Sequence, residues 1–128
     1  MLVSAPLTNR VSTMEAKAIG RFTRIAPRKA RVIATLVRGK NVADALNMLK
    51  FTRKSAAPIY GKLLESALAN ARQKDENVDV DRLYVKVAFA DKAPDKNMRR
   101  WRPRAMGRAT RIQKGMSHIT IVLGLREN

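Results

Sequence analysis

The stretch LYVKVAFADKAPDKNMRRWRPRAMGRATRIQKGMSHITIVL, residues 83–123, decides the fold. At both of its ends, over residues 83–89 and 118–123, apolar residues recur at every second position, which is typical of half-buried strands. The residues between these two ends carry no apolar stripe and cannot build a core of their own. Because the flanking strands can pair with each other, the simplest structure is a long β-hairpin whose distal half leaves the domain as an arm.

The middle of this stretch is strongly basic. Nine Lys and Arg residues fall between residues 92 and 114, and Asp95 is the only acidic residue among them, so the local charge is +8. Six of the nine are Arg, whose planar guanidinium group pairs with phosphate and stacks flat on bases. An arm with like charges this dense repels itself in water, and a bound polyanion removes that cost. We therefore expect nucleic-acid contacts from Lys92, Lys96, Arg99, Arg100, Arg102, Arg104, Arg108, Arg111 and Lys114.

Trp101 lies inside the Arg cluster, and an exposed Trp can stack on an unpaired base. Pro94 and Pro103 bracket the expected tip of the arm and stiffen it, which lowers the entropy lost on binding. An Arg-rich arm with an aromatic residue suits splayed-out nucleotides better than a regular duplex, so RNA is the expected partner. Because nothing in the segment packs, we expect the arm to be unordered in the free protein.

Two short helices are predicted before this stretch. The first opens at Pro27, which suits the first helical position because its missing N–H would be unpaired there, and it ends at Gly39. Asn41 is the expected cap of the second helix. Met48 and Phe51 extend the apolar stripe of the second helix, and we expect both of them in the core.

A longer helix and a further strand complete the expected elements. Ser55 is the expected cap of a helix of about residues 55–74. Residues 15–24 alternate loosely and predict a strand, with Phe22 on the same side as Ala16. Residues 1–14 lack periodicity and are interpreted as a tail that orders only on a partner.

A second basic set is predicted on the first helix. Arg28 and Lys29 stand at its N-terminal end, where phosphate is favoured but where their own charges oppose the helix dipole, so function is the expected reason for them. A third set, formed by Arg53, Lys54 and Lys62, is equally consistent with RNA contact and with a solvated face. The single histidine is expected to be structural or RNA-contacting rather than catalytic. The further expected RNA-binding residues are Arg28, Lys29, Arg31, Arg38, Lys40 and His118.

Composition limits the function classes. The chain has 128 residues, a formal charge of +17, a sequence pI of about 11.4 and 45% hydrophobic residues. These values fit one domain with a core and a polyanionic partner. The absence of Cys excludes disulfides and thiolate chemistry, and a single His excludes a His–His metal site. No apolar run reaches the ~18 residues of a membrane helix, and residues 1–10 do not resemble a secretory signal, so we expect an intracellular protein without a membrane partner.

We expect no catalysis, metal or cofactor. The patterns GxxxxGK[ST], GxGxxG, GxSxG and HExxH do not occur. Two other functions compete with RNA binding. An architectural DNA-binding protein with a β-arm would need a dimer face that the sequence does not show. A metal-dependent nuclease would need a site in the acidic loop of Asp75, Glu76, Asp79 and Asp81, whose spacing does not fit a calcium loop.

Three segments carry a resemblance to a known family. They are IAPRKARVIATLVRGKNVADALNMLKF at residues 25–51, AAPIYGKLLESALANA at residues 56–71 and RWRPRAMGRATRIQKGMSHITIVL at residues 100–123. In order and spacing the chain resembles the bacterial large-subunit ribosomal protein L22 family over about residues 14–125. Trp101 stands where an aliphatic residue is frequent in that family, and Ala26 stands where a Ser cap is frequent.

The resemblance implies an α+β fold in which three helices pack on a small three-stranded antiparallel sheet with a long protruding β-hairpin arm. It implies one domain over residues 1–128, with a globular part at about 14–90 and 115–125 and an arm at about 88–114. Met98, Arg99 and Arg100 match the family's tip, which would face the polypeptide exit tunnel.

The resemblance also implies a function and its partners. The expected function is that of a structural constituent of the cytoplasmic ribosome, which binds large-subunit rRNA, supports assembly and lines the exit tunnel. The expected partners are large-subunit rRNA, neighbouring ribosomal proteins including the L4 family at the tunnel constriction, and the nascent polypeptide. The protein would be a monomer within the ribosome.

Overall fold

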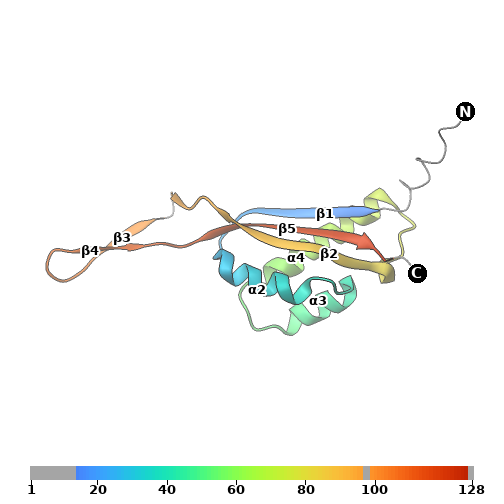
Figure 1. Ribbon diagram of the computed structural model, residues 1–128, viewed down its shortest axis with the longest axis horizontal. Coiled ribbons are helices and arrows are strands. Elements are labelled where there is room, and N and C mark those ends of the chain that lie inside the picture. The colour runs from blue at the N-terminus through green and yellow to red at the C-terminus, as the bar shows by residue number, and fades with distance from the viewer. Residues whose placement is uncertain (1–13, 97–98, 127–128) are drawn as a thin grey trace, which may run out of the picture.

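The computed structural model describes residues 14–96 and 99–126. Its main sheet has the strand order β1-β5-β2, with both neighbouring pairs antiparallel, and a second, two-stranded sheet pairs β3 with β4. Three helices lie on one side of the main sheet, while the small sheet projects away from them (Figure 1). This architecture confirms the expected α+β fold. The elements are β1 (Glu15–Thr23), α2 (Pro27–Val37), α3 (Val42–Phe51), α4 (Ala57–Lys74), the 3-10 turn η1 (Val80–Arg82), β2 (Leu83–Ala93), β3 (Arg100–Pro103), β4 (Ala109–Ile112) and β5 (Met116–Leu125).

The core lies between the main sheet and the helices. α4 packs against β1 and β5, α2 packs against β2 and β5, and α3 packs against α4. Alternate residues of the central strand β5, among them Ile119, Ile121 and Leu123, are fully buried, as their period-2 pattern predicted. Tyr60 of α4 is also fully buried, and its hydroxyl donates to the backbone oxygen of Ala30 in α2 at 2.8 Å. This bond joins α2 and α4, which both pack on the central strand β5.

The ends of the helices confirm some predictions and correct others. Pro27 opens α2, and Gly39 follows its end with a φ of 82°, a left-handed conformation that glycine adopts easily. Asn41 occupies the N-cap position of α3, but its side chain makes no capping bond. The prediction that Ser55 caps the third helix is wrong. α4 begins at Ala57, because the Ala57 N–H closes a preceding turn onto the Lys54 oxygen at 3.1 Å and Ser55 lies within that turn.

Two aromatic residues lie elsewhere than the sequence suggested. Phe51 is 85% exposed, so its assignment to the core is wrong, whereas Met48 is half-buried against the core. The reason is helical geometry, because Phe51 stands about 200° around the helix from the buried Leu49. Phe22 is exposed and has a φ of 53°, and the β1–β5 register shifts between Gly20 and Thr23. The alternation of β1 therefore breaks before Phe22, which does not share the buried side of Ala16.

The hairpin arm leaves the main sheet in two steps. The β2–β5 ladder ends where Ala93 pairs with Met116, and the β3–β4 ladder runs from the pair of Arg100 with Ile112 to the pair of Pro103 with Ala109. A turn over residues 104–108 closes the hairpin.

This turn corrects the expected position of the tip, because it lies beyond Pro103 and is not bracketed by Pro94 and Pro103. Arg99 and Arg100 stand at the start of the β3–β4 ladder nearest the body. The third residue of that expected tip, Met98, and most of the expected tail, residues 1–13, lie outside the described residues.

Candidate nucleic-acid interface

The β3–β4 ladder presents its side chains to solvent. All four residues of β3 and the first three residues of β4 are exposed. Trp101 is 67% exposed and pairs across the ladder with Arg111, while Arg102 pairs with Thr110. Arg104 and Arg108 flank the closing turn and are exposed. The arm therefore displays guanidinium groups and one large ring that the protein's own core does not use.

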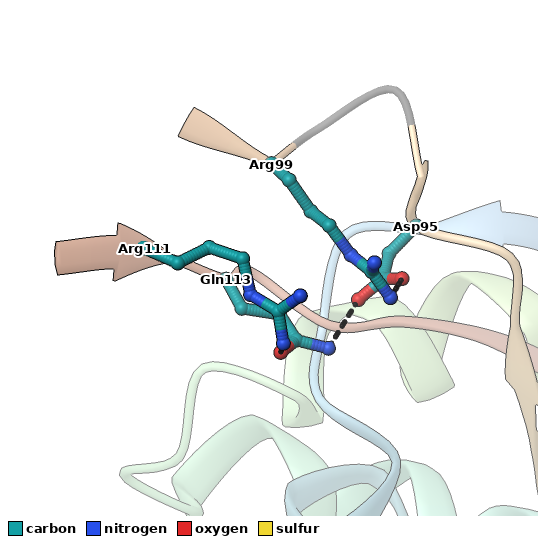
Figure 2. Close-up of polar contacts among 4 residues, drawn as sticks. All are labelled: Asp95, Arg99, Arg111 and Gln113. Atoms are coloured by element: carbon teal, nitrogen blue, oxygen red, sulfur yellow. Dashed lines mark hydrogen bonds and ion pairs between the residues drawn. The ribbon is translucent and has the colours of Figure 1, made fainter. Parts of the chain in front are cut away.

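A polar cluster, which we call the root clasp, joins the two legs of the arm at the end of the β3–β4 ladder nearest the body (Figure 2). It consists of Asp95 and Arg99 on the outgoing leg and Arg111 and Gln113 on the returning leg. The Asp95 carboxylate is only 4% exposed and accepts a bond from Gln113 Nε2 at 3.0 Å, and a guanidinium nitrogen of Arg99 lies 3.5 Å away. Arg111 donates in turn to Gln113 Oε1 at 3.2 Å. The hydrogen bond from Gln113, supported by the positive charges of Arg99 and Lys92, lowers the pKa of Asp95.

Sequence reasoning did not assign a role to Asp95 or Gln113. The one available signal was that Asp95 is the single acid among nine cations. Its partner Gln113 lies 18 residues away, and only the hairpin brings the two together.

Beside the clasp lies a cavity, the root hollow, with a volume of about 370 Å³. It forms where the returning leg of the arm passes the start of α2. At Gly115 this leg comes within van der Waals contact of the helix start, because a Cβ at that position would lie 3.4 Å from the Cα of Ala26. A neighbouring cavity shares Lys29 and Ser55 with the root hollow and adds Arg53 and Lys54. The root hollow is lined by Arg24, Ile25, Ala26, Lys29, Ser55, Arg100, Gln113, Lys114 and Gly115.

The basic residues of the first helix fall into two groups. Arg28 and Lys29 are exposed in the first turn of α2, which has no acidic residue and no side-chain cap. Arg31 Nε instead donates to the Ala90 oxygen at 3.1 Å, and a guanidinium nitrogen of Arg38 donates to the Ala88 oxygen at 2.7 Å. Arg31 and Arg38 therefore also hold the fold together.

The remaining predicted cations lie in different surroundings. Lys40 follows α2, and its Nζ lies 3.1 Å from the Met48 sulfur. Lys92 is exposed near the end of strand β2, and Lys96 is exposed beside Asp95 on the outgoing leg. Lys114 lines the root hollow opposite the start of α2. The structure thus brings Lys29, Arg100 and Lys114 together and leaves Lys40 apart from them.

His118 already has structural partners. Its Nδ1 accepts the backbone N–H of Phe22 at 3.1 Å, and its ring packs edge to face on Phe22 with 4.8 Å between the centroids. This contact stabilises the irregular end of β1.

The acidic loop serves local turns. Asp75 Oδ1 accepts the Asn77 N–H at 3.0 Å, and Asp79 Oδ1 accepts the Asp81 N–H at 3.1 Å. Among residues 14–96 and 99–126, no three His, Asp or Glu side chains group closely enough to hold a metal ion. Over the same ranges, no helix combines the length and the apolar character needed to cross a membrane.

Comparison with known proteins places this arrangement among close relatives. Residues 18–124 match the family described as "Ribosomal protein L22p/L17e". The large ribosomal subunit protein uL22 of Sorangium cellulosum is 55% identical over 114 residues, which cover 89% of this chain and all of the relative. The protein of the same name from Syntrophobacter fumaroxidans is 54% identical over 86% of this chain and 97% of the relative. That from Staphylococcus aureus strain Newman is 51% identical over 86% of this chain and 92% of the relative.

Proposed function

The chain belongs to the ribosomal protein L22p/L17e family, and on that premise we propose that it binds large-subunit rRNA, supports assembly of the subunit and lines the exit tunnel with its arm. Family membership makes it a ribosomal protein and not an enzyme. The observation that carries the proposal is the exposed β3–β4 ladder, whose guanidinium groups and Trp101 ring have no role in the protein's own core.

The proposed RNA-binding surface has two parts. The arm supplies guanidinium groups that pair with phosphates and a ring that stacks on a base. The start of α2 and the root hollow supply cations close to the body. The assigned residues are Lys92, Lys96, Arg99, Arg100, Trp101, Arg102, Arg104, Arg108, Arg111 and Lys114 on the arm, and Arg28, Lys29, Arg31, Arg38, Lys40 and His118 on the body.

Salt dependence tests the arm against the rest of the basic surface. We compare Arg102→Gln/Arg108→Gln on the arm with Lys50→Gln/Arg72→Gln on α3 and α4, because both pairs are exposed and remove the same charge. The slope of log affinity for large-subunit rRNA against log salt should fall by about 0.7 for each lost phosphate contact in the arm variant. Equal losses in both variants would refute the assignment to the arm, and a preference for duplex DNA over rRNA would refute the proposed function.

We propose that the tunnel-facing part extends from the expected tip, Met98, Arg99 and Arg100, to the turn at residues 104–108. The nascent polypeptide and a neighbouring protein of the L4 family are its proposed partners there. A photo-crosslinker at Met106, which is 93% exposed, should capture a stalled nascent chain in ribosomes that contain the variant protein. The same group at Lys62 on α4 is the control. Capture from Lys62 alone would contradict the proposed orientation.

A further inference from the structure

We infer that the root hollow is a binding site for one backbone phosphate of the RNA, at the point where the RNA strand passes from the helical body of the protein to its arm. This inference rests on the proposed function and gives the hollow a specific role within it. Its chemical ligand is a phosphodiester group, bound by cations from the body and the arm together.

The first argument is the convergence of like charges. Arg24 follows β1, Lys29 lies on α2, Arg100 begins β3 and Lys114 precedes β5, yet all four side chains line one cavity. No carboxylate is among the residues that line it. Like charges around one cavity repel one another, and a phosphate among them turns that repulsion into attraction.

The second argument is the polar end of α2. The first N–H groups of a helix have no partner within the helix. Ala26 stands at the N-cap, where it offers no side-chain acceptor, and the first turn contains no acid. Ala26 and Lys29 both line the hollow, so the positive end of this 11-residue helix forms part of its wall. An anion in the hollow supplies the acceptor that Ala26 cannot.

The third argument is that the root clasp prepares the hollow without occupying it. Gln113 lines the hollow, but its amide nitrogen is bonded to Asp95 and its amide oxygen accepts from Arg111. The clasp fixes both legs of the arm between the two ladders, where Arg100 and Lys114 reach the hollow. Asp95 and Gln113 are therefore positioning residues, while Arg24, Lys29, Arg100 and Lys114 bind.

An NMR titration of the full chain tests the site without RNA. Sodium phosphate should shift the backbone amides of Arg28 and Lys29 saturably, and sodium chloride at equal ionic strength should not. Lys114→Gln should raise the phosphate concentration for half-saturation several-fold, whereas the control Arg72→Gln, at an exposed position of α4, should leave it unchanged. Equal shifts with phosphate and chloride, or equal effects of the two variants, would overturn the inference.

A double-mutant cycle with large-subunit rRNA tests whether one phosphate is shared. If Arg24 and Lys114 hold the same group, Lys114→Gln should lower affinity by a different factor in the Arg24→Gln background than in the wild type. Equal factors in both backgrounds would show separate contacts and overturn the shared site. If the proposed function were wrong but the phosphate site real, the result would differ from these outcomes. The wild-type protein would then show no preference for rRNA over duplex DNA, while its phosphate titration would still be saturable.

Discussion

Trp101→Ala should weaken binding to large-subunit rRNA and leave the fold unchanged. The side chain is 67% exposed, and its ladder partner Arg111 is also exposed, so the body loses no buried contact. Stacking of one base on an aromatic ring contributes about 1–3 kcal/mol, which corresponds to a loss of about 5- to 150-fold in affinity. The substitution removes no charge, so the salt dependence of binding should keep its wild-type slope.

Phe51→Ala is the matched control, because Phe51 is 85% exposed on α3 and lies outside the arm. Both variants should unfold in urea within about 0.5 kcal/mol of the wild type, as is usual for exposed sites. Filter binding at several salt concentrations then separates stacking from charge. An equal loss of affinity in both variants, or a loss in Trp101→Ala that follows a loss of stability, would refute the assignment of Trp101 to base stacking.

Three further predictions concern the body and the arm. Tyr60→Phe should cost about 1 kcal/mol in urea unfolding at neutral pH, because it removes a buried hydrogen bond to Ala30. Burial raises the pKa of Tyr60 to about 12 in the fold, so the stability that its neutral form contributes is lost as pH rises from about 10 to 12. The difference in unfolding free energy between the wild type and Tyr60→Phe should therefore shrink over this pH range. Parallel pH profiles of the two proteins would contradict this. Asp95→Ala should speed amide exchange at residues 99–101 and 111–113 and leave the exchange of the core amides unchanged. The exposed control Asp91→Ala should alter neither set of amides. Unchanged exchange at residues 99–101 and 111–113 in Asp95→Ala would show that the clasp does not hold the two legs together. In the free protein, the amides of residues 102–110, beyond the clasp, should exchange fast and become slow on rRNA, and protection there before binding would contradict the expectation that this part of the arm is unordered.

The body was predictable because its signals are local. Residues 118–123 alternate in hydrophobicity because only one face of the sheet meets the helices, and β5 lies there as expected. The expected alternation of residues 83–89 holds only up to Val85, because the β2–β5 register shifts between Val85 and Val87; Val87 and Phe89 are exposed, and Ala88 is buried instead. Pro27 marks the start of α2 and Gly39 follows its end, and each does so through its own backbone preference without a distant partner. Ser55 misled because the turn before α4 is closed by backbone contacts, which its side chain does not reveal.

The arm was predictable in kind but not in register. Its residues have no buried face, so hydrophobic periodicity could not fix which residue pairs with which. The family resemblance set the expected tip at Met98–Arg100, whereas the ladder pairs Arg100 with Ile112 and closes over residues 104–108. Gln113 lies 18 residues from Asp95, and no local pattern connects a lone acid with a distant amide.

The cations of the chain do not all have the same role, since some of them bond to the protein's own backbone. β2 is an edge strand, and an exposed strand edge invites association with other chains. Part of this edge is covered by α2 and the link after it. Val85 exchanges backbone bonds with Gly39 and Lys40, while Arg38 and Arg31 donate to the next carbonyls along the strand.

Neutralising Arg31 or Arg38 would therefore uncover strand carbonyls as well as remove positive charge, so a loss of RNA binding in such variants could come from either change. Arg102 and Arg108 stand on the exposed arm, where the body's core does not depend on them. Their substitution reports on the ligand alone. The surface that binds RNA is accordingly to be mapped from the arm and the root hollow inward, because a charge can be removed there without loosening the sheet.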